Sequence, residues 1–309
     1  MIDCHVHFSG SIPVGFVWDV IKSRGWDYLA GSMDDVRESV EFDGSLGFDG
    51  FLNKFRIFDE LSWDEELLEL SIKAVADQII ADGLDFVWLD FSINKYLHSI
   101  HWHKRDLIKF FYDKFELYAP GRVALVLSVK YESLEASRRQ YLELISDDVV
   151  CECVAGLDLV GDEKFFDAEF YAPYFWEWAR HNKMLRVHVG EVGRVDNVGS
   201  ALRCLPITNI AHGIDIVGDM DLVALARDMR IQFDLALTSN LLIREGLSIS
   251  DHPIFNMLDL GLKCTIGSDD PVVFKTSLSR EYDYIVDDST KAVLKKTALD
   301  FTRSYGFLL

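Results

Sequence analysis

The feature of this sequence that most constrains its fold is the regular recurrence of short apolar runs separated by stretches of helix length. Runs rich in apolar and β-branched residues occupy positions 2–8, 86–91, 123–129, 151–159, 185–188, 209–212, 231–237 and 262–267. Apolar residues with helical spacing follow at 62–83, 105–118, 133–146, 168–182, 195–204, 219–229, 251–260 and 288–303. Strands that alternate with helices form βα units on a parallel sheet. Eight such units in 309 residues predict an α/β fold of the (βα)8 TIM-barrel type.

Residues 8–61 do not fit a single βα unit. This stretch combines short helical patterns with many aromatic residues, among them Phe42, Phe48, Phe51, Phe55 and Phe58. We expect it to form a helical lid excursion after the first strand, over the barrel end where such enzymes place their sites. Neither a repeat nor a linker divides the chain, so we expect a single domain over residues 1–309.

The charge balance narrows the range of partners. The 51 Asp and Glu residues outnumber the 31 Lys and Arg residues, and the formal net charge of −20 repels nucleic acids and anionic membranes. We therefore expect a small-molecule partner, no nucleic acid and no membrane. The first residues lack the pattern of a secretory signal, and the five cysteines include no CxxC pair, which favours a cytoplasmic protein with reduced thiols. The oligomeric state is left open by the sequence.

Side chains that can bind a metal gather at the ends of the predicted strands. His5 and His7 are two residues apart on the first strand, so both point to the same side. His188, His212 and Asp269 lie at or just after the ends of the fifth, sixth and eighth strands. Because the carboxyl ends of barrel strands converge, we expect these side chains to meet. Three neutral imidazoles and one carboxylate match a catalytic zinc that keeps a position for water.

The same residues stand in motifs with a family likeness. HVHFSGS, GLDLVGDE, HVGE, AHG, TSN and SDDP occur in this order between residue 1 and about residue 280. They resemble the motifs of the adenosine deaminase family, the metal-dependent deaminases of the amidohydrolase superfamily. The resemblance implies one Zn²⁺ per chain, bound by His5, His7, His188 and Asp269.

The resemblance also implies how a purine is bound and attacked. Glu191 protonates the purine N1 and His212 holds and deprotonates the attacking water, so that Glu191, His212 and Asp269 form the catalytic set. The substrate-binding residues that it implies are Asp270 toward N7, the backbone of Gly161 toward N3, Ser9 at the sugar end, and Phe51 and Phe55 of the apolar lid helix.

The chemistry of deamination needs these groups. Replacing an aromatic amine by oxygen requires a strong nucleophile at neutral pH, and a bound metal lowers the pKa of water to about 7. Attack at C6 moves electrons onto N1, and Glu191, three residues after His188, can supply the proton if its pKa is raised. We therefore expect a zinc-dependent aminohydrolase that converts adenosine or deoxyadenosine to inosine or deoxyinosine and ammonia.

Because the sequence departs from the family pattern at several positions, substrates other than adenosine remain alternatives. Ser9 stands where adenosine deaminases usually carry an Asp that contacts the ribose 5′-hydroxyl. The second strand ends Leu89-Asp90-Phe91, where the family commonly carries Glu-x-Arg. The alternatives are an N6-substituted or 5′-modified nucleoside, an AMP-type nucleotide or adenine as substrate, and a nucleoside-binding relative without turnover.

A second metal site is not expected. His101 and His103 lie between a predicted strand and helix without a matching acidic partner. His98, His181 and His252 are expected at the surface or at helix ends. The run CECVAGLDLVG has no lysine, whereas relatives with a bridging lysine after the fourth strand need one, which disfavours a two-metal hydrolase.

Overall fold

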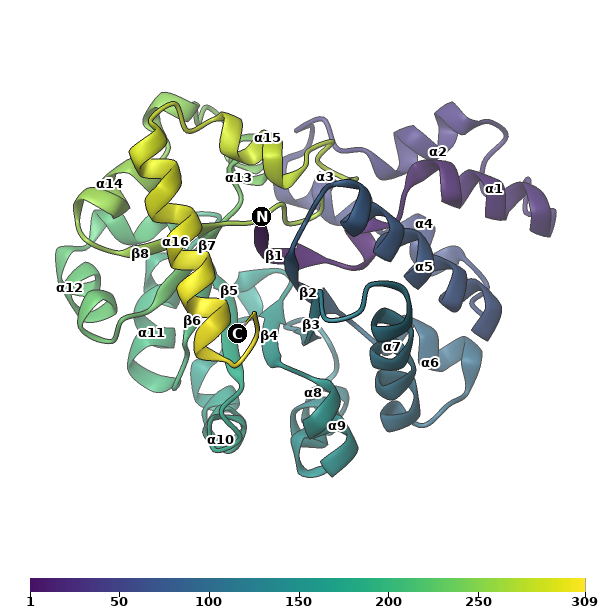
Figure 1. The fold of residues 1–309 in the computed structure, drawn as a ribbon, viewed down its shortest axis with the longest axis horizontal. Helices are drawn as coiled ribbons and strands as arrows, with labels where there is room; N and C mark the ends of the chain where they lie inside the picture. Colours follow the sequence, from purple (N-terminus) through teal and green to yellow (C-terminus); the bar gives the residue numbers. More distant parts are fainter. Residues whose placement is uncertain (309) are drawn as a thin grey trace.

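A parallel eight-stranded sheet forms the centre of the molecule. The computed structural model describes residues 1–308, apart from the side chain of His98. The strands follow one another in chain order and all neighbouring strands are parallel (Figure 1). They are β1 (Ile2–His7), β2 (Phe86–Phe91), β3 (Val123–Lys130), β4 (Gly156–Val160), β5 (Met184–Val189), β6 (Asn209–His212), β7 (Gln232–Leu235) and β8 (Lys263–Ile266). A bridge between Val6 and Asp269 brings the segment after β8 back to β1, which confirms the predicted (βα)8 barrel.

Helices surround the sheet. They are α1 (Val14–Arg24), α2 (Met33–Val40), α3 (Gly47–Asn53), α4 (Arg56–Glu60), α5 (Glu65–Ala81), α6 (Asn94–Ile100), α7 (Lys104–Tyr118), α8 (Glu135–Leu142), α9 (Asp148–Cys153), α10 (Ala168–Ala179), α11 (Val195–Cys204), α12 (Met220–Asp228), α13 (Leu237–Ile243), α14 (Ile254–Asp259), α15 (Leu278–Asp283) and α16 (Asp288–Ser304). The first four lie between β1 and β2 and gather on one side of the barrel (Figure 1), which confirms the helical excursion after the first strand. Within the described residues, no helix is long and apolar enough to cross a membrane.

The start of the fourth predicted strand is wrong. Residues 151–153 belong to α9, and β4 begins only at Gly156. The side chain of Asp147 accepts hydrogen bonds from the backbone N–H groups of Val149 and Val150, and this N-cap starts a helix in an apolar run. A short apolar run does not distinguish a strand from a buried helix, so the cap decides the local structure.

The N-terminus of α5 also differs from the prediction. The predicted helical stretch starts at residue 62, but α5 starts at Glu65, and Asp64 caps it by accepting a hydrogen bond from the Leu67 N–H at 2.8 Å. Asp64 also pairs with Arg24 of α1. This ion pair links the helical excursion to the N-terminus of α5. The short helices α6, α13 and α15 lie outside the predicted helical stretches.

The inner face of β5 shows how the barrel interior changes from base to mouth. Met184, Arg186 and His188 alternate along the strand and all three are buried, so they face the same side. Met184 packs in an apolar cluster with Trp88, and α16 covers β1 and β8 beside it. The interior is thus apolar at the amino end, charged in the middle, and able to bind a metal at the carboxyl end.

Candidate active site

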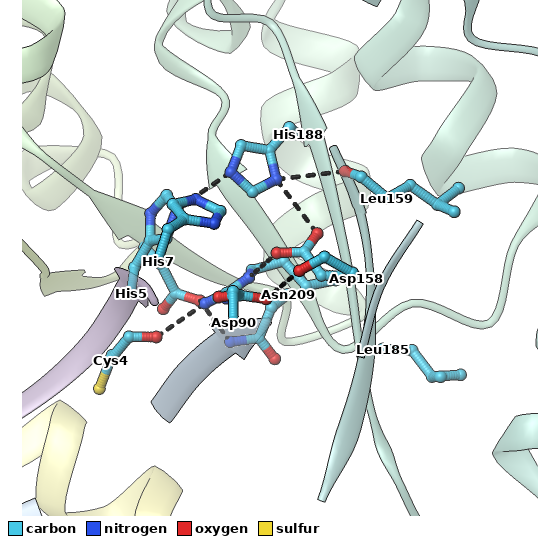
Figure 2. A network of polar contacts seen from close by, with 12 residues as sticks. Cys4, His5, His7, Asp90, Asp158, Leu159, Leu185, His188 and Asn209 are labelled. Atoms are coloured by element: carbon cyan, nitrogen blue, oxygen red, sulfur yellow. Dashed lines mark hydrogen bonds and ion pairs between the residues drawn. The ribbon is translucent and has the colours of Figure 1, made fainter. Parts of the chain in front are cut away.

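Three histidine side chains converge at the carboxyl end of the barrel. The Nε2 atom of His5 lies 3.1 Å from Nε2 of His7 and 3.0 Å from Nε2 of His188 (Figure 2). The Oδ1 atom of Asp269 lies 3.4 Å from Nε2 of His7 and 3.7 Å from Nε2 of His5. The structure therefore brings together all four residues predicted as zinc ligands.

The hydrogen bonds of His188 show that its Nε2 offers a lone pair to this centre. Its Nδ1 lies 3.1 Å from a carboxylate oxygen of Asp158 and 3.1 Å from the carbonyl oxygen of Leu159, and both of these atoms only accept (Figure 2). The proton of a neutral His188 therefore sits on Nδ1. Burial lowers the pKa of His5 and His7 well below the usual value, and nearby positive charges add to this. Neutral imidazoles whose nitrogens converge, with one carboxylate, suit a divalent zinc.

The backbone around Asp269 is held in an unusual conformation. Asp269 has a φ of 59° and His212 a φ of 61°, in the left-handed region that residues other than glycine seldom adopt. The Asp269 N–H donates to the carbonyl of His5 at 2.8 Å, and the His7 N–H donates to the carbonyl of Asp269 at 2.7 Å. These bonds fix Asp269 beside the two histidines of β1, and such strain is typical of functional sites.

A buried carboxylate, Glu163, holds the loop that carries Glu191. One of its oxygens accepts from the N–H groups of Glu191 (3.1 Å) and Val192 (3.0 Å). The other accepts from the Gly190 N–H (2.8 Å) and from the Asn197 side chain (3.1 Å). Sequence reasoning assigned no role to Glu163, although it lies in the GLDLVGDE motif.

Glu191 itself is buried and lies close to His212. Its Oε1 is 3.5 Å from Nε2 of His212, and Arg244 donates a hydrogen bond to its backbone carbonyl at 2.9 Å. Burial raises the pKa of Glu191 well above its usual range, and the negative charges of Asp269 and Glu163 raise it further. This direction favours the protonated form of Glu191, which is the form that a general acid requires.

A chain of hydrogen bonds behind His212 fixes the position of its proton. His252 Nδ1 accepts from the backbone N–H of Ile254 at 3.1 Å, so the proton of a neutral His252 is on Nε2. That Nε2 donates to the side-chain oxygen of Asn240 at 3.2 Å, and the Asn240 amide nitrogen donates to His212 Nδ1 at 3.1 Å. A neutral His212 consequently carries its proton on Nε2, toward Glu191.

The prediction that His252 lies at the surface or at a helix end is wrong in part. His252 precedes α14, but its side chain is buried, and burial lowers its pKa to about 4. The residue is neutral at physiological pH, which the hydrogen-bond chain through Asn240 requires. Its spacing from His212 in the sequence gives no sign of this role.

Asp270 has the properties of a hydrogen-bond donor toward a ligand. Its side chain is buried, and its Oδ1 has no hydrogen-bond partner among the described residues. Burial raises the pKa of Asp270 well above its usual range, and the charge of Asp269 raises it further. Gly10 makes this position possible, because a Cβ atom at residue 10 would come within 1.8 Å of Asp270 Oδ1.

A single cavity of about 120 Å³ connects these groups. Its lining contains every predicted site residue except His5, which is fully buried beneath it: His7, Ser9, Phe51, Phe55, Gly161, His188, Glu191, His212, Asp269 and Asp270. Phe48, Phe51 and Leu52 of α3 form an apolar wall. Lys95 and Lys130 also line the cavity, and sequence reasoning did not identify them.

Below the histidines, one buried arginine binds three aspartates. Arg186 donates to Asp158 at 2.6 Å, to Asp234 at 3.1 Å and to Asp90. Figure 2 shows Asp90 and Asp158 in this network, next to the carbonyl of Cys4, which accepts from Arg186 at 2.7 Å. Because Asp158 also contacts His188, the network supports a predicted metal ligand from below. Asp90, the middle residue of the Leu89-Asp90-Phe91 segment, thus has a partner on β5.

The described residues show no second metal cluster. All groups of three or more ligand atoms within reach of one ion draw on the residues of this site: His5, His7, His188, His212, Asp269 and Asp270. His101 and His103 belong to none of these groups. The surface position predicted for the His98 side chain lies outside the described part of the chain.

Comparisons with known proteins agree with this geometry. A sequence model of the adenosine deaminase family matches residues 1–297. The adenosine deaminase of Clostridium kluyveri is 24% identical, over 95% of this chain and 86% of that protein. The fold resembles the N6-mAMP deaminase of arabidopsis (TM-score 0.82, 20% identity, 97% and 92% of the two chains). It also resembles an amidohydrolase of Burkholderia ambifaria with bound Zn (TM-score 0.78, 17% identity, 98% and 90% of the two chains).

The family match covers nearly the whole chain, including every residue of the converging site. Relatives over this length are hydrolytic deaminases, and the solved structures share the barrel. The chain therefore belongs to the adenosine deaminase family of the amidohydrolase superfamily and is a hydrolytic deaminase.

Proposed function

We propose that this chain removes the C6 amino group of a purine that carries a sugar, with adenosine or deoxyadenosine as the parent substrate and ammonia as a product. The observation that carries this proposal is the meeting of a His₃Asp ligand set with Glu191 and Asp270, two buried carboxyl groups of raised pKa, around one cavity. Metal ligands alone would suit many hydrolases. A buried acid on one side of the centre and a buried donor on the other suit the edge of an aminopurine.

We propose that His5, His7, His188 and Asp269 hold one Zn²⁺. When bound, zinc supplies a hydroxide nucleophile at neutral pH by lowering the pKa of water to about 7. The convergence of the three Nε2 atoms supports this ligand set. The zinc-bound amidohydrolase of similar fold supports the choice of metal.

In this proposal, Glu191 and Asp270 bind the purine ring, and Glu191 also activates it for attack. As oxygen adds at C6, Glu191 gives its proton to N1 and becomes a carboxylate. That carboxylate can take the proton of the new C6 hydroxyl and pass it to the amino group, which leaves as ammonia. Protonated Asp270 donates a hydrogen bond to N7, which is an acceptor, and the backbone of Gly161, with a φ of 99°, faces N3. The aromatic wall of α3 lies beside the sugar.

His212 holds the attacking oxygen. Because Asn240 donates to its Nδ1, the proton on Nε2 points into the site, and a neutral His212 acts as a hydrogen-bond donor. The family resemblance gives His212 a second task, deprotonation of the water, which needs an unprotonated Nε2. The hydrogen-bond chain favours the holding role over the basic one.

Nucleotides are the second candidate class of substrate. Two lysines in the cavity and a likeness to an N6-mAMP deaminase favour this class. The neutral Ser9 favours a nucleotide over an unmodified nucleoside, because an Asp at this position would repel the phosphate of a nucleotide. Adenine matches the cavity less well, because adenine has no sugar to contact the part of the cavity lining that lies beyond the groups assigned to the purine ring.

An ultraviolet assay tests the proposal. Protein purified without added metal and assayed for zinc is incubated with adenosine, deoxyadenosine, AMP, N6-methyl-AMP and adenine, and the loss of the 6-amino absorbance is followed. We expect turnover of at least one sugar-bearing substrate and loss of activity after chelation of the metal. Tight binding of inosine or IMP without turnover of any substrate would instead identify a non-catalytic binding protein.

A further inference from the structure

A lysine with an unusual environment lines the cavity. Lys95 is in the first turn of α6, and its Nζ donates to the hydroxyl of Ser9 at 3.0 Å. The ammonium lies 5.6 Å from the ring centre of Phe58 and 6.0 Å from that of Tyr96. Only 14% of its side chain is exposed. Aromatic rings and a hydroxyl therefore hold this cation in a defined place facing the cavity.

The charge of Lys95 is incompletely compensated. Its acidic neighbour, Asp59 of α4, lies 3.7 Å away, beyond hydrogen-bond distance, and 55% of the Asp59 side chain is exposed. Burial lowers the pKa of Lys95 to about 8, so the group remains mostly protonated at neutral pH. An anion placed in the cavity would relieve this unfavourable burial of charge.

A second cation faces the same space. Lys130, the last residue of β3, lines the cavity, and its positive charge contributes to the lowered pKa of Lys95. In the part of the chain that the structure describes, Lys130 forms no ion pair. Glu132 also lines the cavity, but its carboxylate faces the loop after β4, where it is 3.4 Å from the Asp162 N–H. Two lysines thus line the same cavity as Glu191 and Asp270.

We propose that Ser9, Lys95 and Lys130 form a subsite for a phosphate on the 5′-carbon of the sugar, which makes a 6-aminopurine nucleoside 5′-monophosphate the preferred substrate. The inference rests on the proposed deamination and adds its substrate class. A phosphate oxygen accepts from an ammonium and from a hydroxyl, and hydrogen bonds between charged groups are the stronger ones. The subsite also explains Ser9, because an Asp there would pair with Lys95 and repel the phosphate.

The net charge of −20 does not oppose this assignment. That charge repels long polyanions, which meet the whole surface, whereas a single phosphate in a cavity responds to the few charges within a Debye length, about 8 Å at physiological salt. The alternative is that Lys95 only ties α4 to the barrel through Asp59 and Ser9. In that case its loss would affect nucleosides and nucleotides alike.

The test compares specificity constants in the metal-loaded enzyme. Values of kcat/KM are measured for AMP, adenosine and 5′-deoxyadenosine with the wild type, Lys95→Gln and Lys130→Gln. Lys109→Gln serves as the control, because Lys109 is an exposed residue of α7 that pairs with Asp113. We expect the wild type to prefer AMP, and Lys95→Gln to lower the AMP-to-adenosine ratio by about 10- to 100-fold, the range for one charged hydrogen bond. Lys130→Gln should lower it less, because its side chain is exposed, and the control should not change it.

Two results would overturn the subsite while leaving the deaminase proposal intact. One is a wild-type enzyme that turns over adenosine or 5′-deoxyadenosine better than AMP. The other is an unchanged AMP-to-adenosine ratio in both Lys95→Gln and Lys130→Gln, of which the second should fold normally. If no aminopurine is deaminated, the proposed function fails, but ligand binding can still test the phosphate subsite. In that case IMP should raise the Tm of the protein more than inosine does, and Lys95→Gln should abolish the difference. Equal shifts by IMP and inosine would count against the subsite.

Discussion

Replacing Glu163 by Gln tests whether this carboxylate positions the general acid. Each of its two oxygens accepts two donors, one pair from Glu191 and Val192 and the other from Gly190 and Asn197. The amide of Gln has the same shape but replaces one oxygen by a donor. Whichever oxygen is replaced, two hydrogen bonds to a charged acceptor are lost and donors face donors. The side chain is 3% exposed, so water cannot easily take over.

The expected loss of stability follows from this count. Hydrogen bonds to charged groups contribute about 1.5–3 kcal/mol each, so two of them give about 3–6 kcal/mol in a rigid site. The loop between β5 and α11 can shift to some extent, so we expect a fall in the free energy of unfolding near the lower limit, about 3 kcal/mol. Because a displacement of about 1 Å can cost 10²-fold in rate, kcat should fall by at least 10-fold while zinc stays bound. Denaturant unfolding, metal analysis and steady-state kinetics measure the three quantities.

A matched control is available on the neighbouring helix. Glu177 of α10 has 47% of its side chain exposed and pairs with Arg180, so Glu177→Gln should change stability by less than about 1 kcal/mol and leave kcat unchanged. If Glu163→Gln behaved like this control, Glu163 would not hold the Glu191 loop, and the position of the acid would depend on other contacts such as that with Arg244.

Three further predictions address the site directly. Glu191→Gln should keep the metal, near one equivalent per chain, and lower kcat by about 10² to 10⁴, the range for loss of a general acid. His188→Ala should instead lose the metal. Near-normal turnover by Glu191→Gln would show that another residue protonates N1. Since burial raises the pKa of Glu191 and the protonated form is the active one, kcat should decline as pH rises through that pKa, and a pH profile measured in Glu191→Gln should lack this decline. Ser9→Asp should place a carboxylate beside Lys95 and favour adenosine over AMP by a further factor of about 10; an unchanged preference would show that Ser9 does not face the 5′ substituent.

The barrel and the ligand set could be predicted because each depends on local or repeating information. Apolar runs at regular intervals identify the strands, and parallel strands in a barrel place their carboxyl ends together, so His5, His7, His188 and Asp269 had to meet once the fold was correct. The α9 error arose because the same apolar run can pack as a strand or as a helix. There the Asp147 cap decided the outcome.

The supporting residues could not be predicted in the same way. Glu163, Asn240 and His252 act through hydrogen bonds to atoms far away in the sequence, and these depend on loop paths that no periodicity encodes. Lys95 is similar, because its role follows from the approach of α4 and α6 to Ser9. A lysine in the first turn of a short helix has no sequence signature of burial.

The barrel interior accounts for the buried Asp90 near the end of the second strand. Asp158 and Asp234 point inward from β4 and β7, and two buried carboxylates require a cation. In the comparison of Leu89-Asp90-Phe91 with Glu-x-Arg, Phe91 stands at the arginine position and Asp90 at the middle position, which faces the other side of the strand. Asp90 points into the interior, where it is a third carboxylate partner of the Arg186 guanidinium. Asp90 and Ser9 both line the cavity, but their partners differ: Asp90 pairs with the buried Arg186 of β5, whereas Ser9 accepts a hydrogen bond from Lys95, the cation that we propose binds the 5′-phosphate.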